Sequence, residues 1–170
     1  GMHERFSWVV WWTSAGTGVG AGHPLGTSAF VGSSVGSSTA EAQSASRARV
    51  PGTVMLDVNC PWSVVEALRY DKELEPLGFM WLEEPVWPPE NYKGLARVRA
   101  TGRHRIAAGE NAGSLHDFMA MIDAGAIDIA QPDVAKTGGV TELLKIAALC
   151  EAHGIEYIPH CALFGPGQLA

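Results

Sequence analysis

The sequence lacks the features that mark several common classes of protein. Only three of its 170 residues are cysteine, and no two of them form a Cys-x-x-Cys pair. An odd number of scattered cysteines argues against a disulfide-stabilised secreted domain, so we expect a reduced, cytoplasmic setting. No apolar run reaches the roughly 20 residues needed to cross a bilayer, and we therefore expect no membrane partner.

Basic residues are also few and dispersed. Lys and Arg together number 12 against 18 Asp and Glu, which gives a formal net charge of −6 and a pI of about 5.4. Proteins that bind a phosphate backbone carry clustered positive charge, and this chain has no basic run. Nucleic acid is therefore excluded as an expected partner.

Residues 1–50 differ in composition from residues 51–170, and we treat them as a separate Gly/Ser-rich segment. They hold nine of the eleven serines and eight of the twenty glycines. Residues 6–12 are predicted to form a strand, and residues 38–49 a short helix. The glycine run at residues 16–22 could cradle a pyrophosphate, as in a dinucleotide-binding domain, but Pro24 and Gly26 interrupt the helix that such a site requires. A loop is the favoured interpretation of this run.

Beyond residue 51, short apolar runs end in an ionisable residue at regular intervals. The residues in these positions recur every 23 to 27 residues and are Asp57, Glu83, Glu110, Asp133 and His160. A strand, a loop, a helix and a return loop take about 25 residues in a β/α repeat. The spacing thus predicts an α/β fold in which one ionisable group stands at the carboxyl end of each strand.

In a (β/α)₈ barrel the carboxyl ends of the strands meet at one mouth, where the functional site lies. Three carboxylates brought together there repel one another unless a cation lies between them, and oxygen ligands suit a hard ion such as Mg²⁺. Taken singly, each of these residues could equally be an ordinary loop or cap residue. Their common phase favours a shared pocket.

The strands are predicted at residues 54–57, 79–83, 105–108, 127–130 and 155–159, and the helices between them begin near Ser63, Pro88, Ser114 and Thr141. Ser63 and Ser114 have the side chain of an N-cap. The apolar sides of the helices are expected to include Val65, Met119 and Leu144. Because a complete barrel takes about 250 residues, we expect a partial (β/α)₈ barrel, about strands three to seven, truncated at both ends.

Several motifs in this part of the chain resemble one family. They are LDVNCPW (56–62), WLEEPVWPPEN (81–91), AAGENAG (107–113), QPDVAKTGGVTE (131–142) and IPHCALFGPGQLA (158–170). They resemble the enolase superfamily, in particular its mandelate racemase branch within the mandelate racemase and muconate lactonizing enzymes. The muconate-lactonizing branch has a lysine where this chain has Asp133, so the racemase and acid-sugar dehydratase branch is favoured.

The resemblance implies a set of roles and a reaction. Asp57, Glu83 and Glu110 would bind Mg²⁺, and Asp133 and His160 would form the catalytic dyad. The reaction implied is removal of the α-proton of a carboxylate substrate, an acid sugar, to give an ene-diolate in a lyase or isomerase. From its place two residues beyond Asp57, we predict that Asn59 touches the metal or the substrate, and we count it as a substrate-binding residue.

The same resemblance identifies elements that the chain lacks. No lysine occurs before Lys72, although the branch carries a lysine on the second barrel strand, and the sequence stops before an eighth strand. The alternative to an enzyme is therefore a catalytically inactive remnant that binds Mg²⁺ or self-associates. Because a piece of a barrel has exposed strand edges, a homo-oligomer is expected.

Four other residues receive a structural prediction. His104, His116 and His153 lie outside the strand ends, and we expect them on the surface. Cys161 adjoins His160, but adjacent strand residues point to opposite sides, so it is predicted to be a small buried thiol and not a nucleophile.

Overall fold

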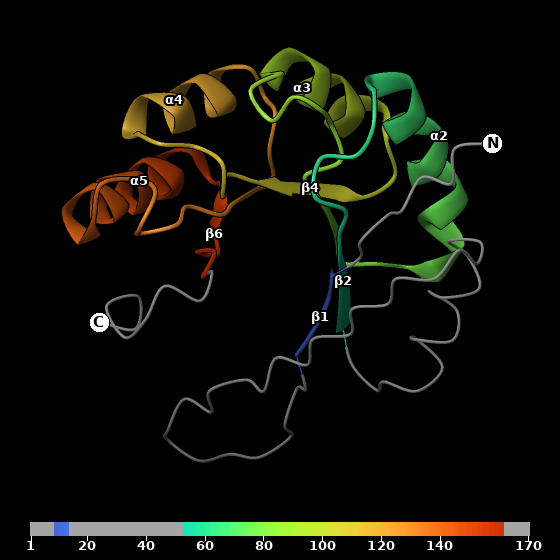
Figure 1. The fold of residues 1–170 in the computed structure, drawn as a ribbon, viewed down its shortest axis with the longest axis horizontal. Helices are drawn as coiled ribbons and strands as arrows, with labels where there is room; N and C mark the ends of the chain where they lie inside the picture. Colours follow the sequence, from blue (N-terminus) through green and yellow to red (C-terminus); the bar gives the residue numbers. More distant parts are fainter. Residues whose placement is uncertain (1–8, 14–52, 162–170) are drawn as a thin grey trace.

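The computed structural model describes residues 9–13 and residues 53–161. For residues 9–13 it describes the backbone alone. Strands and helices alternate regularly from residue 53 onward (Figure 1). The strands are β1 (Val9–Thr13), β2 (Thr53–Asp57), β3 (Trp81–Glu83), β4 (Arg105–Ala108), β5 (Ile129–Ala130) and β6 (Glu156–Tyr157). The helices are α2 (Val64–Leu74), the 3₁₀ turn η1 (Glu75–Leu77), α3 (Tyr92–Thr101), α4 (Leu115–Asp123) and α5 (Val140–His153).

The described strands form one sheet in the order β1-β2-β3-β4-β5-β6. Strands β2 to β6 are parallel, each pairing with the next in the sequence. Their helices lie in an arc along one side of the sheet (Figure 1). This arrangement confirms the prediction of an α/β fold built as part of a barrel.

Strand β1 is an addition to this pattern. It pairs antiparallel with β2, with Val9 opposite Asp57 and Thr13 opposite Thr53. The predicted strand at residues 6–12 is therefore confirmed over its described part. The glycine run at residues 16–22, the helix at residues 38–49 and the boundary between residues 50 and 51 lie outside the described residues.

Helix starts follow the local sequence. Ser63 caps α2 in a capping box, in which its side chain accepts from the backbone of Glu66 while the Glu66 carboxylate accepts from the backbone of Ser63. Ser114 caps α4 by accepting from Asp117 N at 3.3 Å. Asn91 caps α3 by accepting from Gly94 N at 3.0 Å. Both predicted serine caps are confirmed.

Side chains alternate between the two faces of the sheet, as strand geometry requires. The face beneath the helices carries the main core, with Leu56, Leu82 and Ile106 packed against residues such as Phe118 of α4. The opposite face carries a smaller buried cluster of Met55, Trp81, Ala107 and Ile129. We call this smaller group the inner cluster. Asp57 and Glu83 lie on the same face of the sheet as the inner cluster, because each is two residues beyond one of its members on β2 and β3.

Several expectations about burial are wrong. Val65, Met119 and Leu144 are 72%, 41% and 67% exposed. The buried residues of their helices, such as Ala67, Phe118 and Ile146, lie on a different side of each helix. Cys161 is exposed, whereas a buried thiol was expected.

Among the three histidines expected on the surface, His116 and His153 are exposed as predicted, but His104 is buried. Its burial is possible because its ring nitrogen Nδ1 lies 2.8 Å from Oδ1 of the buried Asp71 on α2. No helix within the described residues combines the length and apolar character needed to cross a membrane.

Candidate metal centre

The carboxyl ends of the parallel strands bring the predicted site residues together. Asp57 and Glu83 are the last residues of β2 and β3 and are neighbours in the sheet register. Glu110 follows β4 after Gly109, whose φ of +135° and contacts leave no room for a side chain, because a Cβ there would lie 2.7 Å from the Phe118 ring. This tight turn carries Glu110 to the same edge of the sheet.

The three acids form a compact group. One carboxylate oxygen from each of Asp57, Glu83 and Glu110 lies within 4.8 Å of the others. Burial, and then the charge of Glu83, raise the pKa of Asp57 to about 8. Burial also raises the pKa of Glu83. These shifts express the cost of burying negative charges and holding them close together, which a bound cation would offset.

Two side chains hold the carboxylate of Glu83. Trp81, two residues earlier on the same face of β3, donates its indole N–H to Glu83 Oε2 at 3.0 Å. Gln131, just after β5, makes a side-chain hydrogen bond to Glu83 that favours its ionised form. Neither residue was predicted from the sequence. The position of Trp81, two residues before a predicted ligand, was the available signal.

Asp133 and His160 form the predicted pair. They face each other across an isolated parallel bridge between the segments that follow β5 and β6. His160 Nδ1 lies 2.7 Å from Asp133 Oδ2, and the other oxygen of Asp133 accepts from the backbone of Ala135 at 2.8 Å. The Asp133 carboxylate is fully buried and only 15% of the His160 side chain is exposed. Asp133 thus fixes the orientation of the imidazole.

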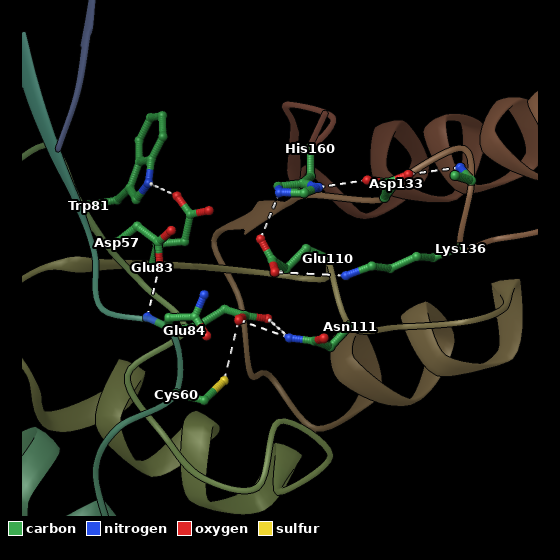
Figure 2. Close-up of polar contacts among 12 residues, drawn as sticks. Asp57, Cys60, Trp81, Glu83, Glu84, Glu110, Asn111, Asp133, Lys136 and His160 are labelled. Atoms are coloured by element: carbon green, nitrogen blue, oxygen red, sulfur yellow. Dashed lines mark hydrogen bonds and ion pairs between the residues drawn. The ribbon is translucent and has the colours of Figure 1, made fainter. Parts of the chain in front are cut away.

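The second ring nitrogen of His160 faces the acid group. Its Nε2 lies 2.9 Å from Glu110 Oε2, so the imidazole joins Asp133 to Glu110 (Figure 2). The hydrogen bond to Glu110, together with that to Asp133, raises the pKa of His160 to about 9 despite its burial. Lys136 adds a weaker ion pair to Glu110, with Nζ 3.8 Å from Oε1. The candidate base and the candidate metal ligands are therefore in direct contact.

Glu84 links the loops behind this group. Asn111 Nδ2 donates to both of its carboxylate oxygens, at 2.9 and 3.0 Å, and Cys60 Sγ donates to Oε2 at 3.3 Å. Burial, and then the charge of Glu110, raise the pKa of Glu84 to about 7. Burial raises the pKa of the Cys60 thiol, which therefore remains a protonated donor. Glu84 connects the segments that follow β2, β3 and β4.

Asn59 occupies an exposed position beside the group. Its φ is +55°, and its backbone N–H donates to Asp57 Oδ1 at 2.9 Å. The backbone of Asn59 thus orients a candidate ligand. Contact of its side chain with substrate stays a prediction.

The donor set fits a hard divalent cation. All three candidate ligands are carboxylates, Trp81 and Gln131 hold one of them from the side, and their mutual repulsion is the kind that a cation relieves. The pair of Asp133 and His160 stands beside them as a candidate proton acceptor.

The chain has a parallel β/α sheet, with three acids and an Asp–His pair at the carboxyl ends of its strands. This combination defines the class of β/α-barrel proteins with a metal site at the mouth of the barrel. Residues 28–170 match the family described as enolase C-terminal domain-like, and the chain belongs to that family. The resemblance inferred from the sequence is thereby confirmed.

Its relatives include acid-sugar enzymes. The chain is 46% identical over 99 residues to a D-galactonate dehydratase of Ralstonia pickettii, covering 58% of this chain and 25% of that protein. It is 38% identical over 107 residues to a 3,6-anhydro-alpha-L-galactonate cycloisomerase of Streptomyces coelicolor, covering 63% of this chain and 29% of that protein.

The structural relatives agree. The L-talarate/galactarate dehydratase of Salmonella typhimurium, solved with Mg and L-lyxarohydroxamate, superposes with a TM-score of 0.70 at 30% identity, covering 76% of this chain and 34% of that one. The chain thus spans about a third or less of the length of these three proteins.

Proposed function

We propose that the chain is part of a Mg²⁺-dependent enzyme that removes the α-proton of an acid sugar, as a dehydratase or a racemase-like lyase. The observation that carries this proposal is the direct contact of His160 with both Asp133 and Glu110, beside three acids within 4.8 Å of one another. The relatives that are dehydratases of sugar acids, and the one solved with Mg, support it.

Each side chain has one task in this proposal. Asp57, Glu83 and Glu110 would hold the cation, and Asp133 holds the imidazole with Nε2 directed to Glu110. A bound cation would withdraw charge from the substrate carboxylate. Glu110 would then ligate the cation and release His160 from the contact that does most to raise the His160 pKa. His160 Nε2 then accepts the α-proton.

The fate of the substrate follows from the position of its leaving group. Where a hydroxyl stands on the β-carbon, loss of the α-proton to His160 is followed by loss of that hydroxyl, which takes up a proton from His160 and leaves as water. The resulting enol becomes a 2-keto-3-deoxy acid. Where no group leaves, the proton returns from solvent. Because His160 presents a single ring nitrogen to the group of acids, we expect it to serve one face of the α-carbon.

The test is incubation of the chain in D₂O with Mg²⁺ and a panel of aldonic and aldaric acids, followed by NMR. We expect deuterium at the α-carbon, or a 2-keto-3-deoxy product, in one epimer series, and loss of both signals on chelation of the metal. Equal exchange in both epimer series would contradict the role given to His160. Mg²⁺ binding with no exchange or elimination anywhere would favour a chain that binds the metal without catalysis.

A further inference from the structure

Gln131 carries a polar atom that no described residue satisfies. Its side chain is only 5% exposed, and it follows β5 at the edge of the sheet where the three acids gather. Among the residues that the structure describes, Gln131 Oε1 is the buried side-chain oxygen or nitrogen without a hydrogen-bond partner. Buried carbonyl oxygens of this kind are rare, because burial without a donor is unfavourable.

The orientation of this amide is fixed by its neighbour. Gln131 makes its side-chain hydrogen bond to the carboxylate of Glu83. An ionised carboxylate can only accept hydrogen bonds, so the NH₂ of the amide must face Glu83 and the oxygen must point elsewhere. Rotating the amide would place two oxygens against each other. The unsatisfied atom is therefore the acceptor, and it lies beside a candidate metal ligand.

The backbone gives this position little freedom. Gln131 N donates to Ala108 O at 3.0 Å, which ties the residue to the end of β4. Ile129, two residues earlier on the same face, packs with Trp81 in the inner cluster. Trp81 and Gln131 thus approach the Glu83 carboxylate from two strands. An acceptor held this firmly is suited to binding a donor that arrives with a ligand.

We propose that Gln131 Oε1 accepts a hydrogen bond from an O–H group bound in the metal centre, while the amide NH₂ orients Glu83. The inference rests on the proposed function for the identity of the site. Two sources can supply the O–H, a hydroxyl of the acid-sugar substrate or a water on the metal ion. Both have the same chemistry toward the carbonyl oxygen, and they are separated by experiment.

The test uses the full chain with Gln131→Met, which keeps nearly the length of the side chain and removes both polar atoms. Gln131→Asn, which withdraws the amide by one methylene, serves if the first variant does not fold as judged by circular dichroism. Asn91→Ala is the control, because the Asn91 side chain caps α3 and accepts from Gly94 N, away from the metal centre. It should lower thermal stability and leave metal binding unchanged.

Three readouts are compared between the wild type and the variants. Mn²⁺ affinity is measured by calorimetry, the number of waters on bound Mn²⁺ by proton relaxation, and the preference for an aldonic acid over analogues that each lack one hydroxyl by titration with Mg²⁺ present. Loss of an outer-shell partner should weaken Mn²⁺ binding about tenfold. The control should show the wild-type value.

The pattern of the other two readouts decides the source. If the O–H belongs to the substrate, the wild type should prefer the complete acid about tenfold over one analogue, and Gln131→Met should lose that preference. If it belongs to a metal-bound water, the variant should hold one ordered water fewer while the preference stays. Unchanged water number and unchanged preference would overturn the acceptor role, even if Mn²⁺ affinity fell.

Failure of the proposed function is recognised separately. A wild-type chain that binds Mn²⁺ but no acid sugar would contradict that function, while the water count would still decide the role of Gln131. A wild type that behaves as proposed, with a Gln131→Met variant indistinguishable from it, would contradict only the inference about Gln131.

Discussion

Within the described residues, two Asp–His pairs have nearly the same contact geometry and different surroundings. His104 Nδ1 lies 2.8 Å from Asp71, and His160 Nδ1 lies 2.7 Å from Asp133. The first pair joins α2 to the segment before β4, at the amino end of the strand, and the second joins the segments that follow β5 and β6, at the carboxyl ends.

Their third partners set the two pairs apart. Asp71 also accepts from the backbone N–H groups of Arg103 and His104, and the His104 ring lies near Phe79. In the part of the chain that the structure describes, the Asp71–His104 pair thus contacts only neighbouring groups of the fold and no part of the candidate metal centre. His160 instead directs Nε2 to Glu110 and the group of acids. An Asp–His contact alone therefore does not define a catalytic pair, whereas its place at the carboxyl end of a barrel strand indicates one.

Apart from loss of the base itself, the largest effect is expected from loss of Asp133. Asp133→Asn should lower the rate of α-proton exchange by up to about 10⁴-fold, because an amide no longer holds the imidazole tautomer, as happens in the Asp–His pair of serine proteases. Thermal unfolding should show that the variant is folded. A rate within threefold of the wild type would remove Asp133 from the proposed mechanism.

The equivalent change in the other pair should act on stability. The two carboxylate oxygens of Asp71 accept from three N–H groups, those of the Arg103 and His104 backbones and of the His104 ring. Asp71→Asn replaces one of these oxygens by an NH₂ that cannot accept, and it removes the charge, so we expect the free energy of unfolding to fall by about 3 kcal/mol in urea titrations. The rate per folded molecule should not change. A variant with wild-type stability and lower activity would reverse the roles that we give to the two pairs.

The link between the second pair and the metal is tested at Glu110. Removing a metal ligand should cost at least as much as removing an outer-shell partner, so Glu110→Gln should weaken Mg²⁺ binding by about 100-fold or more in calorimetry. Glu142→Gln is a matched control, because Glu142 pairs with Lys145 on the exposed side of α5. Equal affinity in Glu110→Gln and in the wild type would eliminate Glu110 as a ligand.

The pH dependence of metal binding and of stability should also distinguish the metal centre from the Asp71–His104 pair. The Asp57 pKa is raised to about 8, so the group carries a proton at neutral pH that must leave before the carboxylate binds a cation. Mg²⁺ affinity should therefore rise by up to about tenfold per pH unit below pH 8 and level off above it.

Burial also acts on Asp71, but hydrogen bonds led by that of His104 outweigh it, and the Asp71 pKa is lowered. That pair stabilises the fold above the ordinary pKa of aspartate and loses its contribution as the pH falls through the lowered value. The free energy of unfolding, measured without metal, should show this loss at acid pH in the wild type, and the contribution of Asp71 to it should be absent in Asp71→Asn. Mg²⁺ affinity that is flat between pH 6 and 8 would contradict the shift at Asp57.

Local patterns predicted the fold because its elements are specified locally. The 23- to 27-residue spacing of ionisable residues, the apolar strands and the caps at Ser63 and Ser114 all depend on neighbours in the sequence. The direction of β1 could not be predicted in this way, because strand pairing is a property of distant segments. The same limit explains the error at His104, whose partner lies 33 residues away.

In the candidate site, too, the features set by local sequence were predicted and those set by contacts between distant segments were not. The phase of the acids placed Asp57, Glu83 and Glu110 at one edge of the sheet, and the family resemblance suggested their roles. Trp81 and Gln131 were missed, since an indole and an amide at the end of an apolar run resemble ordinary core and loop residues. Their relation to Glu83 appears only once β3 and β5 are placed across β4 from each other.

The most direct test of the difference between the two pairs is to make the same histidine substitution in each. Deuterium incorporation at the α-carbon of the best acid sugar should be measured with saturating Mg²⁺ for the wild type, His160→Asn and His104→Asn, per folded molecule. We expect no detectable incorporation with His160→Asn and a wild-type rate with His104→Asn. Incorporation that survives in His160→Asn would show that the Asp133–His160 pair is not the base of this site.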